Sequence, residues 1–399
     1  MNATTNPFTP GAGCPPPVRM GNDYVLNNAN KLLDYTWDGS SPQGMLLIGL
    51  RGVGKTVLLN QIERMAIDRS HISIIRLEID ENRSFTEQLV PEFRKVLYEL
   101  NRFPDEKPAI KRGVLALQNF VNSAGVNYKT ICDYLEPLQG IADSGDLKRD
   151  LCDLLLTVAA AAKSRQRTIL LLIDEMQYMA ENELCALIFS MKQAYHITAP
   201  IALVGAGLPN LSSNAVLTQS NVENLFRYCD IEQLNKTEAQ EVISIPAKRA
   251  GREFTQEALD AIFHETHGYP YFLQIWAYNL WNTTTAREIS LSDVIKAKPY
   301  IKTELDRNFF RKYFNKLTPK EQLFMHFMAR YNNDECTLNE VQSQMKSSSA
   351  DIARIQEQLV RKGMLSDGPH YSMQFTIPLF QQFLLQLSPL YLYMRYPKE

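Results

Sequence analysis

The sequence lacks several features that mark common classes of protein. It contains only six cysteines and six histidines in 399 residues, with no Cys-x-x-Cys pair and no His-x-x-x-His spacing. Scattered cysteines in a chain of this size are typical of a reducing compartment, so we expect free thiols and no zinc site. The formal net charge of −2 argues against a protein that coats a polyanion over its whole surface.

Long apolar runs are also missing. No stretch approaches the roughly 18–20 apolar residues of a membrane span, and the densest stretch, Leu154–Ala162, is interrupted and Ala-rich. The N-terminal segment has neither a basic region nor an apolar core, unlike a secretory signal. We therefore predict a cytoplasmic protein. The hydrophobic content of 45% is ordinary for a globular chain, and the length predicts two or three domains.

Short apolar runs alternate with helical patterns in the first half of the chain. We expect buried strands at 45–48, 72–79, 168–173 and 200–204, with the last strand breaking at Gly205–Gly207. Helices are expected between them, including a mostly helical insertion at about 84–165. Such alternation predicts an α/β fold, in which a parallel sheet carries helices on both faces.

The second half of the chain loses the strand pattern after about residue 234. Helical patterns at 237–251, 255–266 and 271–281 predict a helical lid, which a charged helical connector at 290–313 follows. Further helices are expected at 318–330, 337–345 and 349–362. Two short alternating segments around Asp367-Gly368 then predict a hairpin. Three helices and a hairpin in this order are typical of a winged helix.

The strongest chemical signal is the segment from Gly49 to Thr56, which fits the pattern G-x-x-x-x-G-K-[ST]. A predicted strand precedes it and a predicted helix follows, which is the context of a phosphate-binding loop. Backbone N–H groups and the helix N-terminus would hold the phosphates of ATP, Lys55 would reach the β- and γ-phosphates, and the Thr56 hydroxyl would bind Mg²⁺. Arg51 would contact either phosphate or a neighbouring acidic residue. The predicted nucleotide-binding residues here are Gly49, Arg51, Gly52, Val53, Gly54, Lys55, Thr56 and Val57.

A second signal is the apolar run 170–173, which ends in Asp174 and Glu175. A carboxylate at the end of a buried strand suits a Mg²⁺ site, so Asp174 is the second predicted metal residue. Glu175 is the predicted general base that activates the attacking water. Gln177 either orients that water or is an ordinary polar residue in the first turn of a helix.

These motifs make the chain similar to a known family. It resembles the bacterial and archaeal-type P-loop ATP-binding proteins at the border of AAA+ and STAND ATPases, which are allied to the origin-recognition initiators. The matching segments are 6–17, 49–60, 144–151, 171–179, 203–211, 267–274 and 375–380. The resemblance implies a three-layer αβα P-loop fold of the AAA+ (ASCE) type. It also implies four parts: a Pro-rich strap (1–20), an ATPase domain (21–233), a helical lid and connector (234–313), and a winged-helix domain (314–399).

The resemblance implies roles for further residues. Gly21 and Asn22 would lie near the adenine, although Asn22 replaces the arginine that is usual there. Gly268 and Pro270 match a lid motif that touches nucleotide in STAND proteins. Arg227 is the candidate for a catalytic arginine finger that acts on a neighbouring copy.

The chain also departs from the family pattern directly after the predicted strand at 200–204. AAA+ proteins often place a polar sensor there, whereas this chain has Gly205, Ala206 and Gly207, with Asn210 as a weak substitute. These departures predict slow hydrolysis, or a switch that nucleotide controls rather than a motor.

The helix expected at 349–362 is the candidate for DNA recognition. Arg354, Arg361 and Lys362 could contact the phosphates of double-stranded DNA, although Asp351 and Glu357 dilute the positive charge. Two functions stay open. One is a Mg²⁺-dependent ATPase that acts as a nucleotide-controlled, DNA-binding switch. The other is a STAND-like regulatory ATPase whose lid and winged helix bind a protein partner or drive oligomerisation without DNA.

Overall fold

The computed structural model of the chain describes residues 5–11, 13–18, 20–37, 43–103, 105, 107–126, 140–212, 217, 224–331, 336–367 and 373–387. The chain divides into two units. The sheet unit contains residues 22–49 and 55–231, and the C-terminal unit contains residues 1–21, 50–54 and 232–399. Residues 50–54 of the predicted phosphate loop therefore group with the C-terminal unit, although both neighbours in sequence belong to the sheet unit.

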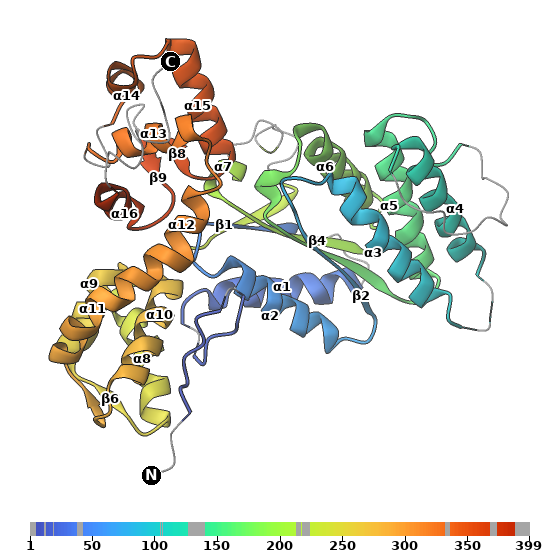
Figure 1. The fold of residues 1–399 in the computed structure, drawn as a ribbon. Helices are drawn as coiled ribbons and strands as arrows, with labels where there is room; N and C mark the ends of the chain where they lie inside the picture. Colours follow the sequence, from blue (N-terminus) through green and yellow to red (C-terminus); the bar gives the residue numbers. More distant parts are fainter. Residues whose placement is uncertain are drawn as a thin grey trace. The chain divides into compact units, whose positions relative to one another are not determined.

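A parallel sheet forms the centre of the sheet unit (Figure 1). In the described part of the chain its strand order is β2-β3-β4-β1-β5, and every pair is parallel. β1, β3 and β4 are buried along their whole length, as apolar strands covered on both faces must be. The strands are β1 (Gly44–Ile48), β2 (Ile72–Glu78), β3 (Thr168–Asp174), β4 (Ile201–Gly207) and β5 (Phe226–Asp230).

Helices cover both faces of this sheet. Alternate residues of β3, namely Ile169, Leu171 and Ile173, pack in one apolar cluster with α3 to α6. Because side chains alternate along a strand, Leu170 and Leu172 face the opposite layer, where Figure 1 shows α1 and α2. The helices are α1 (Asp23–Trp37), α2 (Lys55–Ile67), α3 (Phe85–Leu100), α4 (Pro108–Ser123), α5 (Leu147–Lys163), α6 (Glu181–His196) and α7 (Pro209–Ser212), with a 3₁₀ turn η1 (Met176–Tyr178). The predicted three-layer α/β fold is confirmed.

One predicted strand ended too early, and another strand was not predicted. The strand expected at 200–204 continues through the glycines to Gly207, where a side chain at Gly205 would collide with the sulfur of Met176. Glycine there permits close packing of η1 rather than breaking the strand. The second miss is β5, which the sequence pattern did not predict. Its buried Phe226 and Cys229 alternate irregularly with exposed Arg227 and Asp230, as fits the end position in the strand order.

The C-terminal unit begins with the predicted lid helices. They are α8 (Lys236–Arg249), α9 (Gln256–Thr266), α10 (Pro270–Thr283) and α11 (Leu291–Leu305), after which η2 (Asp306–Phe310), a π-helical turn, leads into α12 (Arg311–Phe314). A short parallel pair, β6 (Glu253–Phe254) with β7 (Glu288–Ile289), corrects the expectation that strands stop after residue 234. Strands of two residues are too short to leave a period in the sequence.

Part of the N-terminal strap packs on this unit. The Phe8 ring lies edge-on to Phe254 and Trp281, with centroid distances of 6.4 and 6.0 Å. The Asn6 side chain donates a hydrogen bond to the Tyr278 carbonyl at 3.0 Å. Buried aromatic packing of this kind anchors residues 6–8 to the lid.

The last part of the chain has the predicted order of elements. α13 (Pro319–Met328), α14 (Leu338–Met345) and α15 (Ser349–Arg361) precede an antiparallel pair, β8 (Leu365–Asp367) and β9 (Met373–Phe375), and then α16 (Phe380–Gln386). Of the predicted turn at Asp367-Gly368, Asp367 is the last residue of β8, and Gly368 lies outside the described residues.

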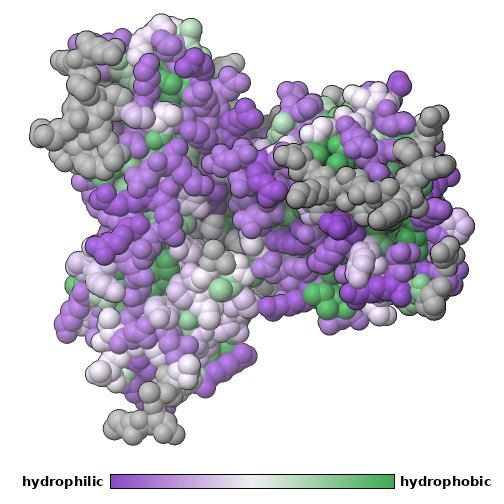
Figure 2. All heavy atoms as spheres, turned by 45° about the vertical axis from the view of Figure 1, so that its right-hand side comes forward, coloured by the Kyte–Doolittle hydropathy of each residue, from purple (hydrophilic) through white to green (hydrophobic). Residues whose placement is uncertain are grey.

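The surface is largely polar where it can be seen. On the face drawn in Figure 2, hydrophilic residues predominate and hydrophobic ones form small separate groups. Among the helices of the described ranges, none is both long and apolar enough to cross a membrane.

Candidate active site

The carboxyl edge of the parallel sheet brings the two motifs of the sequence together within the sheet unit. β1 ends at Ile48, and the backbone N–H of Gly49 donates to the Gly207 carbonyl at the end of β4, at 3.2 Å. β3 ends at Asp174 on the other side of β4. Ligands of open α/β sheets bind at this edge, and the strand order places Gly49, Lys55 and Thr56, at the two ends of the phosphate loop, beside the carboxylates.

The phosphate loop has the backbone that its glycines permit. Gly52 and Gly54 have φ values of +80° and +104°, which residues with a side chain rarely adopt. α2 begins at Lys55, whose Nζ donates to the Gly49 carbonyl at 2.8 Å, so the lysine side chain lies back across the start of the loop. An ammonium group and a helix N-terminus beside one loop form an anion site.

Asp174 and Thr56 form the candidate metal site. The Thr56 hydroxyl donates to Asp174 Oδ2 at 2.8 Å, and Asp174 is only 2% exposed. Burial raises the pKa of Asp174, which the Thr56 hydrogen bond and the Arg76 guanidinium, at 3.6 Å, only partly oppose. Burial therefore penalises the ionised carboxylate, which lies beside a hydroxyl. Oxygen donors of this kind fit Mg²⁺, and a cation would stabilise the ionised carboxylate.

Glu175 follows directly in a left-handed backbone conformation, with φ at +56°. Its backbone N–H donates to Asp174 Oδ1 at 2.9 Å, which ties the two acidic residues together. The Gln177 side chain donates through Nε2 to Glu175 Oε2, and its Oε1 accepts the backbone N–H of Leu208 at 3.2 Å. The two alternatives predicted for Gln177 were orienting the attacking water and an ordinary polar position in a helix, and the contact with Leu208 was not predicted.

Arg51 has contacts within the C-terminal unit. Its Nη2 donates to the Lys362 carbonyl at 3.2 Å, and its guanidinium carbon lies 5.0 Å from the centre of the Tyr313 ring. The Gly52 carbonyl accepts a long hydrogen bond, 3.4 Å, from the backbone N–H of Tyr271. In the same loop Val53 is buried, while Val57 in α2 is partly buried.

The residues singled out near the adenine and in the lid occupy turns. Gly21 and Asn22 have positive φ values just before α1. Gly268 approaches the Leu234 carbonyl so closely that a side chain would collide with it, and Pro270 is the first residue of α10. These positions explain the residue types by backbone geometry, and a role in binding nucleotide stays a prediction.

Arg227 lies on β5 and is exposed. Its Nη1 donates to Asn28 Oδ1, in α1, at 2.8 Å. A role as an arginine finger for a second copy stays a prediction.

The three cations proposed for DNA differ in their surroundings. Arg354 and Arg361 are exposed on α15, whose buried side carries Ile352, Ile355 and Leu359. Lys362 instead pairs through Nζ with Glu321, at 2.8 Å, and Glu321 is 1% exposed. Lys362 thus forms an ion pair within its own unit.

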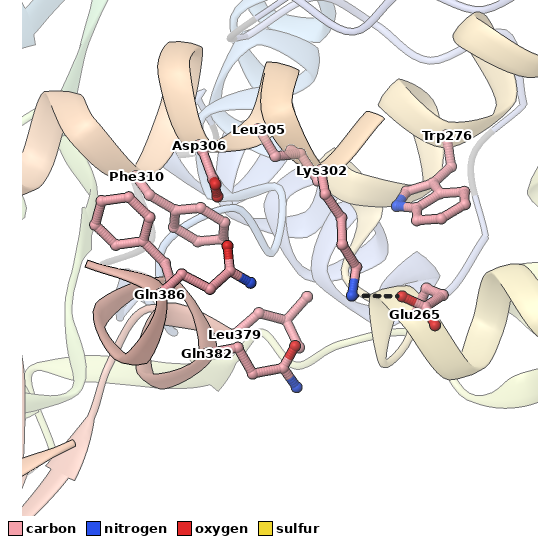
Figure 3. Close-up of a pocket in the computed structure, with 10 residues that line it drawn as sticks. Glu265, Trp276, Lys302, Leu305, Asp306, Phe310, Leu379, Gln382 and Gln386 are labelled. Carbon is pink, nitrogen blue, oxygen red and sulfur yellow. Dashed lines mark ion pairs between the residues drawn. The ribbon is translucent and has the colours of Figure 1, made fainter. Parts of the chain in front are cut away.

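A small cavity lies elsewhere in the C-terminal unit, among α10, α11, η2 and α16 (Figure 3). Its volume is about 30 Å³, and Lys302 pairs with Glu265 at its edge, at 3.2 Å. Such a volume holds one or two waters, so it cannot take a nucleotide.

Comparisons with known proteins agree with this geometry. Residues 26–197 match the AAA ATPase domain, and residues 307–384 match a domain of unknown function, DUF8462. A Walker-type ATPase of Pyrococcus abyssi has a TM-score of 0.51 and 14% identity, over 90% of this chain and 94% of that chain. The ORC2 protein of Aeropyrum pernix, solved as ADPNP–ADP complexes, has a TM-score of 0.51 and 11% identity, over 94% of this chain and 96% of that chain. A comparison with curated proteins gives no match.

Proposed function

We propose that this chain is a Mg²⁺-dependent ATPase that acts as a nucleotide-controlled switch, a proposal supported by the match of residues 26–197 to the AAA ATPase domain. The observation that carries the proposal is the hydrogen bond between Thr56 and Asp174. It joins the first turn of the helix after the phosphate loop to the carboxylate at the end of β3. In this arrangement Thr56 and Asp174 can hold a metal ion next to the N-terminus of α2, where the phosphates would bind.

Each residue has a defined task in this mechanism. The N-terminus of α2 and Lys55 bind the phosphates. Thr56 and Asp174 would hold Mg²⁺, which when bound supplies positive charge to the transferring phosphoryl group. Glu175 takes a proton from the attacking water as a general base, and the burial of Asp174 beside it keeps the site partly dry.

A pair of variants tests the ATPase proposal. Glu175→Gln is expected to lower kcat by about 100-fold or more while ATP still binds, because only proton removal is lost. Lys55→Ala is expected to weaken ATP binding itself. Phosphate release and binding of a fluorescent ATP analogue are measured on each variant. Hydrolysis by Glu175→Gln at the wild-type rate would refute the general base.

The switch would act through the C-terminal unit. The order α13–α14–α15–β8–β9 supports a winged-helix domain, and residues 50–54 of the phosphate loop already group with this unit. Arg51 contacts Lys362 at the end of α15. Binding or loss of phosphate at the loop would therefore be felt at these contacts.

DNA is one candidate partner, because Arg354 and Arg361 are exposed on α15. The test is binding of double-stranded DNA with ATP and Mg²⁺, using Glu175→Gln to hold the ATP state. We expect binding that weakens steeply with salt and is reduced in Arg354→Ala/Arg361→Ala. Lys248→Ala/Arg249→Ala, which removes the same charge from α8, is the matched control.

A protein partner or a second copy is the other candidate. The exposed Asp351 and Glu357 on α15 favour it, because they reduce the attraction of the helix to phosphates. ATP-dependent assembly in sedimentation, without DNA affinity in any nucleotide state, would support this function and refute the DNA proposal.

A further inference from the structure

We infer that Gln177 is a positioning residue for hydrolysis, which holds the carboxylate of Glu175 against the end of β4. The inference rests on the proposed ATPase function. Its basis is the geometry of one side-chain amide, whose two polar atoms bind two different partners within the sheet unit.

The orientation of the amide is fixed by its partners. Gln177 is 9% exposed and lies in η1, one residue beyond Met176. The backbone N–H of Leu208 can only donate, so the atom that faces it must be the oxygen Oε1. The nitrogen Nε2 then faces Glu175, to whose carboxylate it donates.

The glycines at the end of β4 make room for this arrangement. A side chain at Gly205 would collide with Met176, and a Cβ at Gly207 would lie 3.2 Å from Gln177 Oε1 and 2.5 Å from Leu211 Cδ2. Glycine at both positions therefore lets η1 pack directly on the strand.

Glu175 has a strained backbone conformation that contacts with its neighbours must stabilise. Its φ of +56° is a conformation that costs energy for a residue with a side chain. Such a conformation persists where the surroundings determine it, and here the Asp174 carboxylate and Gln177 bind the backbone and the side chain of Glu175. A misplaced base lowers the rate of the chemical step without changing how the phosphates bind.

Two variants separate positioning from a purely structural role. Gln177→Glu keeps an oxygen for the Leu208 N–H but has no donor for Glu175. We expect it to lower kcat by about 10–100-fold, with the dissociation constant of an ATP analogue within about two-fold of wild type. Gln177→Met has a similar size and neither polar atom, and we expect the same loss of kcat. Melting temperatures show whether each variant is folded.

The outcomes discriminate clearly. Wild-type kcat in Gln177→Glu would mean that Gln177 only satisfies Leu208, and a raised kcat in Gln177→Met would mean that it restrains Glu175. Either result overturns the inference. Loss of hydrolysis in Glu175→Gln, without loss in folded Gln177→Met, refutes the inference and leaves the ATPase proposal intact. A wild-type protein that does not hydrolyse ATP refutes both.

Discussion

Two aspartates of the sheet unit have the same small exposed fraction but different surroundings, and Asp174 lies deeper in the protein. Asp150, near the start of α5, and Asp174, at the end of β3, are both 2% exposed. Asp150 accepts hydrogen bonds from the Ser123 hydroxyl at 2.5 Å, the Ser144 hydroxyl and N–H at 2.6 and 2.9 Å, and the Gly145 N–H at 3.0 Å. Burial alone would raise the pKa of Asp150, but these bonds outweigh it and the pKa is lowered.

The pKa of Asp174 is raised instead, because burial there outweighs the Thr56 hydrogen bond and the attraction of Arg76. A buried carboxylate such as Asp150, whose oxygens accept hydrogen bonds from the protein itself, stabilises the fold. A buried carboxylate with a raised pKa is suited to a partner from outside the chain, and the proposed partner of Asp174 is a cation. In the segment 144–151, the hydrogen bond between the Ser144 hydroxyl and Asp150 closes a turn just before α5.

Among the variants that compare these two aspartates, the largest effect is expected at Asp174. Asp174→Asn keeps the size of the side chain and removes the charge, so we expect Mg²⁺-dependent hydrolysis to fall by about 10–100-fold. The free energy of unfolding in metal-free buffer should stay the same or rise, because a buried charge is gone. Phosphate release at several Mg²⁺ concentrations and urea unfolding measure the two effects. A large loss of stability would mean that Asp174 supports the fold as Asp150 does.

The opposite result is expected at Asp150. Asp150→Ala leaves the Ser123 and Ser144 hydroxyls and the Ser144 N–H without their acceptor, so the free energy of unfolding should fall by about 3 kcal/mol. The rate of hydrolysis per folded molecule should not change. Asp68→Ala, at an exposed position just after α2, is the control and should change stability by less than about 0.5 kcal/mol. Equal losses of unfolding free energy in Asp150→Ala and Asp68→Ala would refute a structural role for Asp150.

A smaller change sharpens the same comparison. Ser123→Ala removes one of the donors to Asp150 and an acceptor for the Gly145 N–H, which lies 3.0 Å from the Ser123 hydroxyl. We expect a loss of about 1–2 kcal/mol, roughly half of that for Asp150→Ala. Added to Asp150→Ala, it should cost much less, because the shared interaction is already gone. Full additivity in urea unfolding would contradict this coupling.

The smallest effect is a difference in pH dependence. The lowered pKa of Asp150 gives stability that is complete above the ordinary value of 3.8 and is lost as the pH falls through the lowered value. The raised pKa of Asp174 has the opposite sign: its cost is largest above the raised value and shrinks as the pH falls toward 3.8. Between pH 8 and pH 5, in metal-free buffer, the penalty of Asp150→Ala should stay constant. Any advantage of Asp174→Asn should become smaller, and an advantage that grows would refute the sign.

Much of the fold follows from local patterns. β1 and β3 are continuous apolar runs. The N-termini of α9, α13 and α15 are marked by the N-cap residues Thr255, Thr318 and Ser348, whose side chains accept hydrogen bonds from the first turn. β5 could not be found in this way, because only Phe226 and Cys229 of its residues are buried. Its place in the sheet depends on pairing with β1, more than 170 residues earlier in the sequence.

The candidate site divides in the same way. Lys55, Thr56, Asp174 and Glu175 carry their chemistry in short motifs, and the strand order brings these motifs together. The Leu208 contact of Gln177 could not be predicted, because it joins η1 to a strand end through a backbone N–H, which leaves no trace in residue type. The glycines of β4 reflect the close packing of η1, but in the sequence they predicted the end of a strand.

The π-helical turn η2 bears on how the chain length can change. Each turn of this kind closes its hydrogen bonds over one more residue than an α-helix, so η2 holds a residue that a regular helix would not need. Deletion of a single residue between 306 and 310 can therefore be absorbed as continuous α-helix from α11 into α12. Elsewhere in these helices the same deletion would turn all following side chains by about 100°. The junction of α11 and α12, near the start of residues 307–384, is thus the place where we expect the loss of a residue other than the buried Phe309 and Phe310 to preserve the orientation of the following side chains.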